Sequence, residues 1–159
     1  MQYTKRDWRN RNQIITPQGV KWLTIPVDVK GKFSQKINET KIADKKWATS
    51  NWNLLKQNYK DSKYFKEMAE WIEPLNKNCS FEYLSEVNIH FIREINKFLK
   101  IETEILFSKD LELGDGKTEK LVKICKDLDV NHYFSGPAAK NYMDEDLFKK
   151  EQIEVTYWD

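Results

Sequence analysis

Four cationic side chains gather near the start of the chain, in the stretch YTKRDWRNRNQI at positions 3–14. They are Lys5, Arg6, Arg9 and Arg11, with one acid among them, Asp7. A pair of guanidinium groups can clamp a phosphate or a carboxylate through paired hydrogen bonds, and a neighbouring tryptophan can stack on a base or a sugar. The stretch therefore predicts an anion-binding site. The alternative, which composition alone favours, is that these charged side chains are simply solvated at the surface.

The geometry expected for this arm follows from strand alternation. If the arm is extended, Arg9 and Arg11 lie on one side of it. On the other side lie Trp8, Asn10 and Asn12. We expect the two arginines to hold the anion, and Trp8 and Trp22 to form the walls around its sugar or base.

The positive charge is concentrated at this end of the chain. Residues 1–36 hold eight Lys or Arg and two acids, a charge of +6, so the remainder carries −4 within a formal total of +2. A nucleic-acid-binding module usually spreads positive charge over a whole face, so the sequence favours a small anionic ligand. A nucleic-acid arm is the alternative, and its affinity would fall steeply with salt.

Composition and length bound the class of protein. Apolar residues make up 40% and charged residues 33% of 159 residues, which is typical of a soluble globular protein. No apolar run approaches the roughly 20 residues that cross a bilayer, so we expect a cytoplasmic protein without membrane contact. The sequence lacks a Pro-, Gly- or Ser-rich linker and predicts one domain over residues 1–159. Cys79 and Cys125 are predicted to be buried thiols, not a disulfide.

The first part of the sequence predicts a β-hairpin followed by a helical section. Residues 12–27 alternate around a turn at Pro17-Gln18-Gly19, and Pro26 marks the end of the second strand. Residues 29–39 are polar with weak periodicity and predict a mobile loop, a candidate lid. Apolar spacing predicts three helices after it, the second ended or kinked by Pro74. They run from Asp44 to Tyr59, from Phe65 to Leu75, and over about residues 82–99.

The last third of the sequence predicts a parallel sheet. Strand, helix and strand patterns follow one another at residues 103–108, 117–128 and 132–135, and such crossovers join parallel strands. A further helical segment, 138–150, leads to a final strand at 153–158. The expected fold class is α/β, a Rossmann-like open and mostly parallel sheet with a β-hairpin near the amino terminus and a helical middle section.

Ligands of open parallel sheets bind beyond the carboxyl ends of the strands, where helix amino termini offer N–H groups. In the turn ELGDGKTEK, the glycine Gly116 allows close approach of a phosphate, and Lys117 and Thr118 stand where the helix begins. This is a candidate phosphate site. The alternative is a glycine-containing turn in which Thr118 or a neighbouring aspartate caps the helix.

The turn YFSGPAAKNYM is a second candidate for substrate binding. Ser135 ends a predicted strand, Gly136 permits an unusual backbone angle, and Pro137 suits a first helical position. The N–H groups of residues 138 and 139 would then be open to an anion, and Tyr142 would line the same opening. A strand-to-helix junction needs such residues even without a ligand, so both interpretations stand.

Neither metal nor nucleophilic chemistry is predicted. His90 falls on the polar side of its helix and is read as a surface residue, and His132 opens a strand without Cys or His at ligand spacing. The acids at positions 144–146 fit the start of a helix better than a catalytic pair. Ser135 would be a nucleophile only with a base that the sequence does not locate. Catalytic residues and a cofactor are therefore left unassigned.

Several segments taken together resemble one bacterial family. In chain order they are QYTKRDWRNRNQI, KWLTIPV, SQKINE, NYKDSKYF and HYFSGPAAKNYMDEDLFKKEQIEVTYWD, and they resemble the WbqC-like protein family along nearly all of the chain. The resemblance implies a place in surface polysaccharide, O-antigen and lipopolysaccharide biosynthesis. It also implies transfer of a glycyl, other aminoacyl or acyl group to an amino sugar or a nucleotide-linked sugar.

Two departures from the family pattern qualify this expectation. The sequence begins after the strand and Gln-, Pro-, Tyr- and Gly-rich turn with which family members usually start, which predicts a truncated form of the domain. Asn51 stands where the family often has a histidine after the helix tryptophan, here Trp47. A non-catalytic nucleotide-sugar-binding or scaffold protein is therefore the alternative to a transferase, and an exposed sheet edge would invite homo-oligomer formation.

Overall fold

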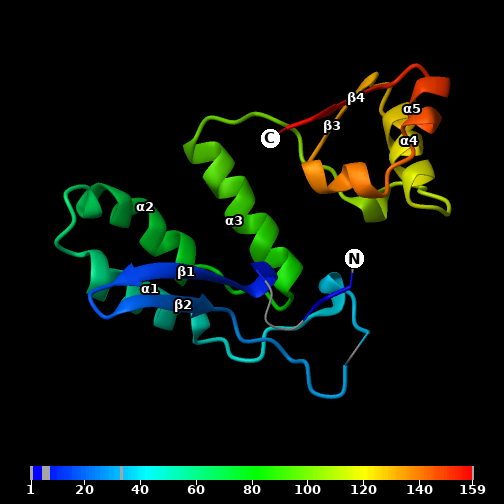
Figure 1. The fold of residues 1–159 in the computed structure, drawn as a ribbon. Helices are drawn as coiled ribbons and strands as arrows, with labels where there is room; N and C mark the ends of the chain where they lie inside the picture. The colour runs from blue at the N-terminus through cyan, green and yellow to red at the C-terminus, as the bar shows by residue number, and fades with distance from the viewer. Residues whose placement is uncertain (1, 5–7, 33, 159) are drawn as a thin grey trace. The chain divides into compact units, whose positions relative to one another are not determined.

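A computed structural model describes residues 2–4, 8–32 and 34–158. The chain forms two compact units, Met1–Glu102 and Thr103–Asp159, and each is described by itself. The described residues form five α-helices and two two-stranded sheets, so the fold is mixed α/β as predicted (Figure 1). Whether the chain acts as the single domain expected from its length stays a prediction.

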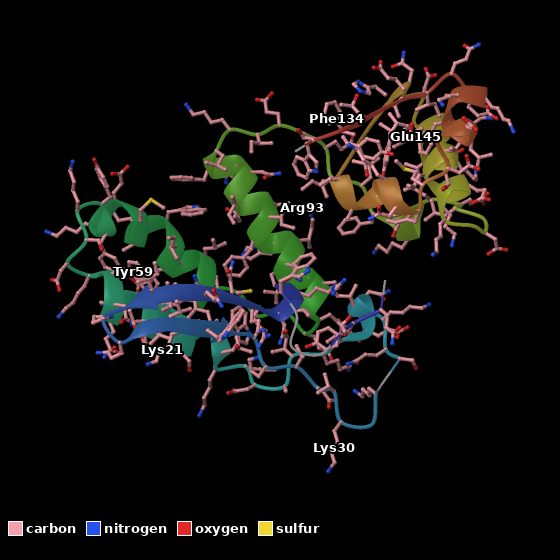
Figure 2. All side chains as sticks on the ribbon, viewed as in Figure 1. Lys21, Lys30, Tyr59, Arg93, Phe134 and Glu145 are labelled. Atoms are coloured by element: carbon pink, nitrogen blue, oxygen red, sulfur yellow. The ribbon has the colours of Figure 1, made fainter. Side chains whose placement is uncertain are left out.

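The first unit begins with the predicted hairpin. Strand β1, Arg11–Thr16, pairs antiparallel with β2, Gly19–Thr24. Pro17 and Gln18 join the strands, and Gly19, the first residue of β2, has a φ of +102°. Glycine tolerates this backbone angle, which explains the turn chemistry seen in the sequence. At the edge of β1 the Ile15 N–H donates to the Tyr59 hydroxyl at 3.0 Å (Figure 2).

The residues before β1 are not extended. Trp8–Asn10 form a single 3₁₀ turn, η1, so the predicted alternation of Arg9 and Arg11 against Trp8 and Asn10 is wrong in this segment. The turn is fixed by Asn10, which is 7% exposed. Its Nδ2 donates to the Ile25 carbonyl at 2.9 Å, and its own carbonyl accepts the Ile25 N–H at 2.8 Å. Lys5 and Arg6 lie outside the described residues.

The segment predicted as a loop and candidate lid carries little regular structure. It contains one 3₁₀ turn, η2 (Ile37–Glu39), and Gln35 accepts the Tyr3 N–H at 3.0 Å. The buried hydroxyl of Thr40 donates to the Lys36 carbonyl at 3.0 Å. A role as a lid stays a prediction.

Three helices complete the first unit, and the sequence predicted all of them. They are α1 (Trp47–Tyr59), α2 (Phe65–Lys77) and α3 (Leu84–Phe98). Trp47 and Val87 pack in a common apolar cluster, and Leu84 is fully buried. Helix α2 continues three residues beyond Pro74, because a proline in the last turn removes only one hydrogen bond of the helix.

The second unit is built around one parallel strand pair. Its elements are η3 (Ser108–Asp110), α4 (Thr118–Asp127), β3 (His132–Ser135), η4 (Pro137–Asn141), α5 (Glu145–Lys150) and β4 (Glu154–Tyr157). Strands β3 and β4 are parallel, and α5 lies in the connection between them. Phe148 is fully buried at the centre of the core and stacks on Tyr133, with ring centroids 5.3 Å apart.

The predicted strand at 103–108 is not formed. Residues 103–107 have no regular structure, and Ser108 begins η3. The strand, helix, strand unit is therefore β3–α5–β4, not the unit predicted around α4. Within the described part of the chain the strands make two separate pairs, so the open Rossmann-like sheet is not present there. A short apolar run such as TEILFS becomes a strand only where a partner strand pairs with it.

Both cysteines are buried and unpaired, as predicted. Burial raises the pKa of the Cys79 thiol to about 11. We therefore expect Cys79 in a Cys125→Ser variant to react slowly with iodoacetamide, with a rate that rises only as the pH approaches 11. The same variant in denaturant should react fast at pH 9. Equal rates in native and denatured protein at pH 9 would show that the thiol is accessible.

No described helix is long and apolar enough to span a membrane.

Candidate functional site

A groove of about 480 Å³ opens in the first unit between the hairpin and helices α1–α3. Five of its lining residues belong to the predicted binding arm: Trp8, Arg9, Asn10, Arg11 and Asn12. Rings and aliphatic chains from the helices form much of the remaining wall, among them Trp47, Leu55, Trp71, Ile72, Phe91 and Ile95. The volume lies within the range of small-molecule sites.

Helical spacing explains how the helices supply this wall. On α1, Trp47, Asn51 and Leu55 follow at intervals of four residues and so share one face. On α2 the same interval separates Ile72 from Asn76. The three predicted helices therefore also supply residues to the groove wall.

Each groove arginine is stacked on an indole. The Arg9 guanidinium carbon lies 5.1 Å from the centroid of the Trp8 ring, and that of Arg11 lies 4.1 Å from the Trp22 ring. Such contacts fix the cation without neutralising it. Trp22 contacts Arg11 and is not among the residues that line the groove, and its role in binding stays a prediction. Trp8 is 76% exposed and lines the groove.

Asparagine amides provide the other polar groups of the wall. They are Asn10, Asn12, Asn51, Asn76 and Asn88. Several are oriented by donating from Nδ2 to a backbone carbonyl: Asn88 to Arg9 at 3.0 Å, Asn76 to Ile72 at 2.9 Å and Asn51 to Thr24 at 3.4 Å. An amide held in this way retains acceptor capacity on its oxygen and a second N–H. The wall thus combines hydrogen-bonding amides with aromatic faces.

The described lining residues include no Asp, Glu, His, Cys, Ser or Lys. Arg9 and Arg11 are the charged members of this set, so the electrostatic field in the groove favours an anion. General acid–base catalysis needs a group that titrates near neutral pH, and arginine does not. The described wall thus carries two guanidinium groups and no side chain that titrates near neutral pH, and anion binding by the groove stays a prediction.

In the candidate phosphate turn of the second unit, Gly116 and Thr118 already contact other parts of the protein. The Thr118 side chain is 5% exposed, and its Oγ1 accepts the Asp144 N–H at 3.1 Å. The Glu119 carboxylate lies where a side chain on Gly116 would point. The negative charge of Glu119 would repel a phosphate at this turn. Phosphate binding by Gly116, Lys117 and Thr118 stays a prediction.

The Ser135-Gly136-Pro137 turn differs from its predicted geometry. Gly136 has φ −73° and ψ 155°, an ordinary extended conformation, so the predicted unusual angle is wrong. The glycine instead makes room for the Trp158 indole, whose Nε1 would lie 3.1 Å from an added Cβ. The prediction that the N–H groups of residues 138 and 139 are both open to an anion is also wrong. Ala139 is buried and donates its N–H to the Gly136 carbonyl at 3.1 Å.

Two tyrosines lie after this turn in sequence. Tyr142 is 58% exposed and follows η4. Burial raises the pKa of Tyr157 to about 12, aided by its hydrogen bond to Glu145 at 2.9 Å. This phenol stays protonated near neutral pH and is no general base there.

The arm and the two glycine turns belong to different units. Binding of one ligand by all of them therefore stays a prediction.

The histidines and acids behave as structural residues. His90 is half-buried between the rings of Phe81 and Phe91, so its predicted surface position is wrong. His132 Nε2 lies 2.7 Å from the Thr156 hydroxyl. Asp144 caps α5 by accepting the Asp146 N–H at 3.1 Å, as the acids at 144–146 predicted. The part of the chain that the structure describes contains no cluster of His, Cys, Asp or Glu suited to a metal ion.

The architecture is that of a mixed α/β protein with a ligand-sized groove in its first unit. The chain belongs to the WbqC-like protein family, whose match covers residues 1–159, and the resemblance read from the sequence is confirmed. It is 45% identical to the uncharacterized protein Rv1507c of Mycobacterium tuberculosis over 159 residues, which are 100% of this chain and 69% of that protein. No solved structure matches the chain.

Proposed function

We propose that the groove binds a nucleotide-linked amino sugar and that the chain is a group transferase of bacterial surface polysaccharide biosynthesis. The observation that carries the proposal is the pair of indole-stacked guanidinium groups in a groove lined by amides and aromatic rings. Arginine binds phosphate oxygens through paired hydrogen bonds, and aromatic faces suit the base and the apolar face of a sugar. Amides match sugar hydroxyl groups as donors and acceptors. A cytoplasmic location is part of the same proposal.

The proposed reaction is transfer of an acyl or aminoacyl group to the sugar amine. The amine nitrogen attacks the carbonyl carbon of an activated donor, a C–N bond forms, and the bond from that carbon to the leaving group breaks. The proton released by nitrogen goes to the departing group. Because the described groove wall offers no base, the contribution of the protein is orientation of the amine and electrostatic binding of the anion.

Titration calorimetry with UDP-N-acetylglucosamine tests the binding step. We expect this sugar nucleotide to bind more tightly than UDP or N-acetylglucosamine alone, because the guanidinium groups and the amides then act on one ligand. The affinity for UDP should fall with added salt. Absence of binding of all three compounds at millimolar concentration would contradict the proposal.

A non-catalytic sugar-nucleotide-binding protein is the second candidate. It is favoured by the absence of titratable side chains from the described groove lining. Mass spectrometry of a UDP-amino sugar incubated with the protein and with glycyl or acyl thioester donors separates the two candidates. A protein-dependent mass increase on the sugar supports a transferase, and binding without any product supports the second candidate.

The strand pair of the second unit suggests a homo-oligomer. We propose that β3 and β4 are the nucleus of a Rossmann-like sheet that a second copy of the chain extends, because a two-stranded parallel sheet leaves strand edges open. Size-exclusion chromatography with light scattering should then give twice the mass of 19.1 kDa. A monomer at all accessible concentrations would exclude this arrangement.

A further inference from the structure

A second cavity lies in the first unit, between α1 and α2. It has a volume of about 250 Å³, and Trp52, Phe65, Met68 and Ala69 are among its apolar lining residues. The cavity is partly open to solvent, since Tyr64 in its lining is 60% exposed, so it is a hollow in the surface of the unit.

This cavity shares part of its wall with the groove. Leu55 on α1 and Ile72 on α2 line both spaces. The anion-binding residues Arg9 and Arg11 line the groove and not the second cavity. A ligand that extends from the arginines past Leu55 and Ile72 would thus pass from a polar, cationic environment into an apolar one.

We propose that the ligand of this protein is amphipathic, an anionic phosphate-containing head joined to an alkyl or acyl chain that enters the second cavity. The inference rests on the proposed anion-binding role of the groove and specifies the class of its ligand. A hollow with a mostly apolar lining favours an alkyl chain, because binding removes the apolar surface of the chain from water. A methylene occupies about as much space as a water molecule, roughly 30 Å³, so the cavity holds about eight methylenes.

The lining residues suit a chain of carbon atoms. The unbranched thioether side chain of Met68 adapts its shape to irregular apolar neighbours. Trp52 and Phe65 stack on each other with ring centroids 6.1 Å apart, and both rings contribute to the lining. At the polar end of the lining, the Lys63 ammonium lies 4.8 Å from the centroid of the Tyr64 ring. Tyr59 and Ser62 also contribute polar side chains to the lining.

A homologous series of alkyl phosphates tests the proposal in the full chain. Butyl, hexyl, octyl and decyl phosphate should bind with an affinity that rises roughly tenfold for each pair of methylenes, until the chain fills the cavity. Tryptophan fluorescence and calorimetry both report the affinity. Affinity that is independent of chain length in the wild-type protein would overturn the proposal.

Variants on α2 test whether the alkyl chain of the ligand lies in the second cavity. Ala69→Trp fills the cavity and should end the rise in affinity at a shorter alkyl chain. Ala69→Leu fills less of the cavity and should give a smaller effect in the same direction, and it replaces the tryptophan variant if that variant does not fold. Glu70→Trp is the matched control, because Glu70 is exposed on the neighbouring position and lines neither space. An identical chain-length profile in Ala69→Trp, Ala69→Leu and Glu70→Trp would also overturn the proposal.

Two further ligands distinguish an acyl chain from an isoprenoid chain as the apolar part of the ligand. Octanoyl-coenzyme A represents an acyl thioester, and geranyl phosphate represents a branched isoprenoid phosphate. Preferential binding of either one identifies the source, and failure of both to bind more tightly than inorganic phosphate contradicts the proposal. Binding of UDP-N-acetylglucosamine without any chain-length effect would remove this inference and leave the proposed function intact.

Discussion

Replacing both groove arginines, Arg9→Ala with Arg11→Ala, is expected to lower the affinity for UDP-N-acetylglucosamine by at least about 100-fold. Hydrogen bonds to charged groups contribute about 1.5–3 kcal/mol each, and the double variant removes both cations of the described groove lining. Each half-buried arginine loses a cation–π contact, to Trp8 or to Trp22, which contributes about 0.5–1 kcal/mol, so the melting temperature should fall by a few degrees without loss of the fold. Calorimetry and thermal unfolding measure the two effects.

The matched control is Lys21→Ala with Lys30→Ala. Both lysines are exposed, belong to the same unit and lie outside the groove lining (Figure 2). This variant removes the same total charge and should keep wild-type affinity. Equal losses in the two double variants would mean that net charge, and not the groove, attracts the anion. Unchanged affinity in the arginine variant would end the proposed function.

Phe148→Ala is expected to unfold the second unit under native conditions. Removing a fully buried phenylalanine costs about 3–5 kcal/mol, and a unit of this size has only roughly 3–9 kcal/mol of stability. Hydrogen exchange with mass spectrometry should show loss of protection over α4 and β4. Peptides from α3 should stay protected if the two units unfold independently.

Phe134→Ala provides the control within the same unit. The Phe134 side chain is 63% exposed, so its removal should leave the exchange pattern nearly unchanged. Loss of protection across both units in Phe148→Ala would instead support the single cooperative domain that the length of the chain predicted. Full protection in that variant would show that the core of the second unit tolerates the cavity.

The elements that the sequence predicted best are those with long, regular apolar spacing. Helices α3 and α4 carry clean apolar stripes, and the hairpin is specified by its turn residues, so both kinds of element were located to within a few residues. The segment 103–108 failed because a six-residue apolar run does not specify a partner strand. The extended arm failed for a related reason: Asn10 binds the backbone of Ile25, and this tertiary contact favours a 3₁₀ turn.

The site was predicted only from its amino-terminal side. Cationic and aromatic residues at positions 8–11 were visible as a cluster. Asn51 was noted only as a departure from the family pattern, and Asn76 and Asn88 were not singled out. A signal for them was present in the sequence, because each asparagine lies four residues from an apolar groove residue: Asn51 from Leu55, Asn76 from Ile72 and Asn88 from Ile92. A polar side chain on an apolar helix face indicates a site, but the groove itself depends on the packing of three helices and a hairpin.

The contact between Arg11 and Trp22 has a consequence for the thermodynamics of recognition. A mobile arginine side chain carries about 2 kcal/mol of rotamer entropy, part of which a ligand must remove when it binds. Here the indole restricts the guanidinium group, which lies 4.1 Å from its ring centre. If the groove binds an anion as proposed, Trp22 strengthens that binding without touching the ligand. A relative without an aromatic residue at this position would then bind the same anion with a larger entropic penalty.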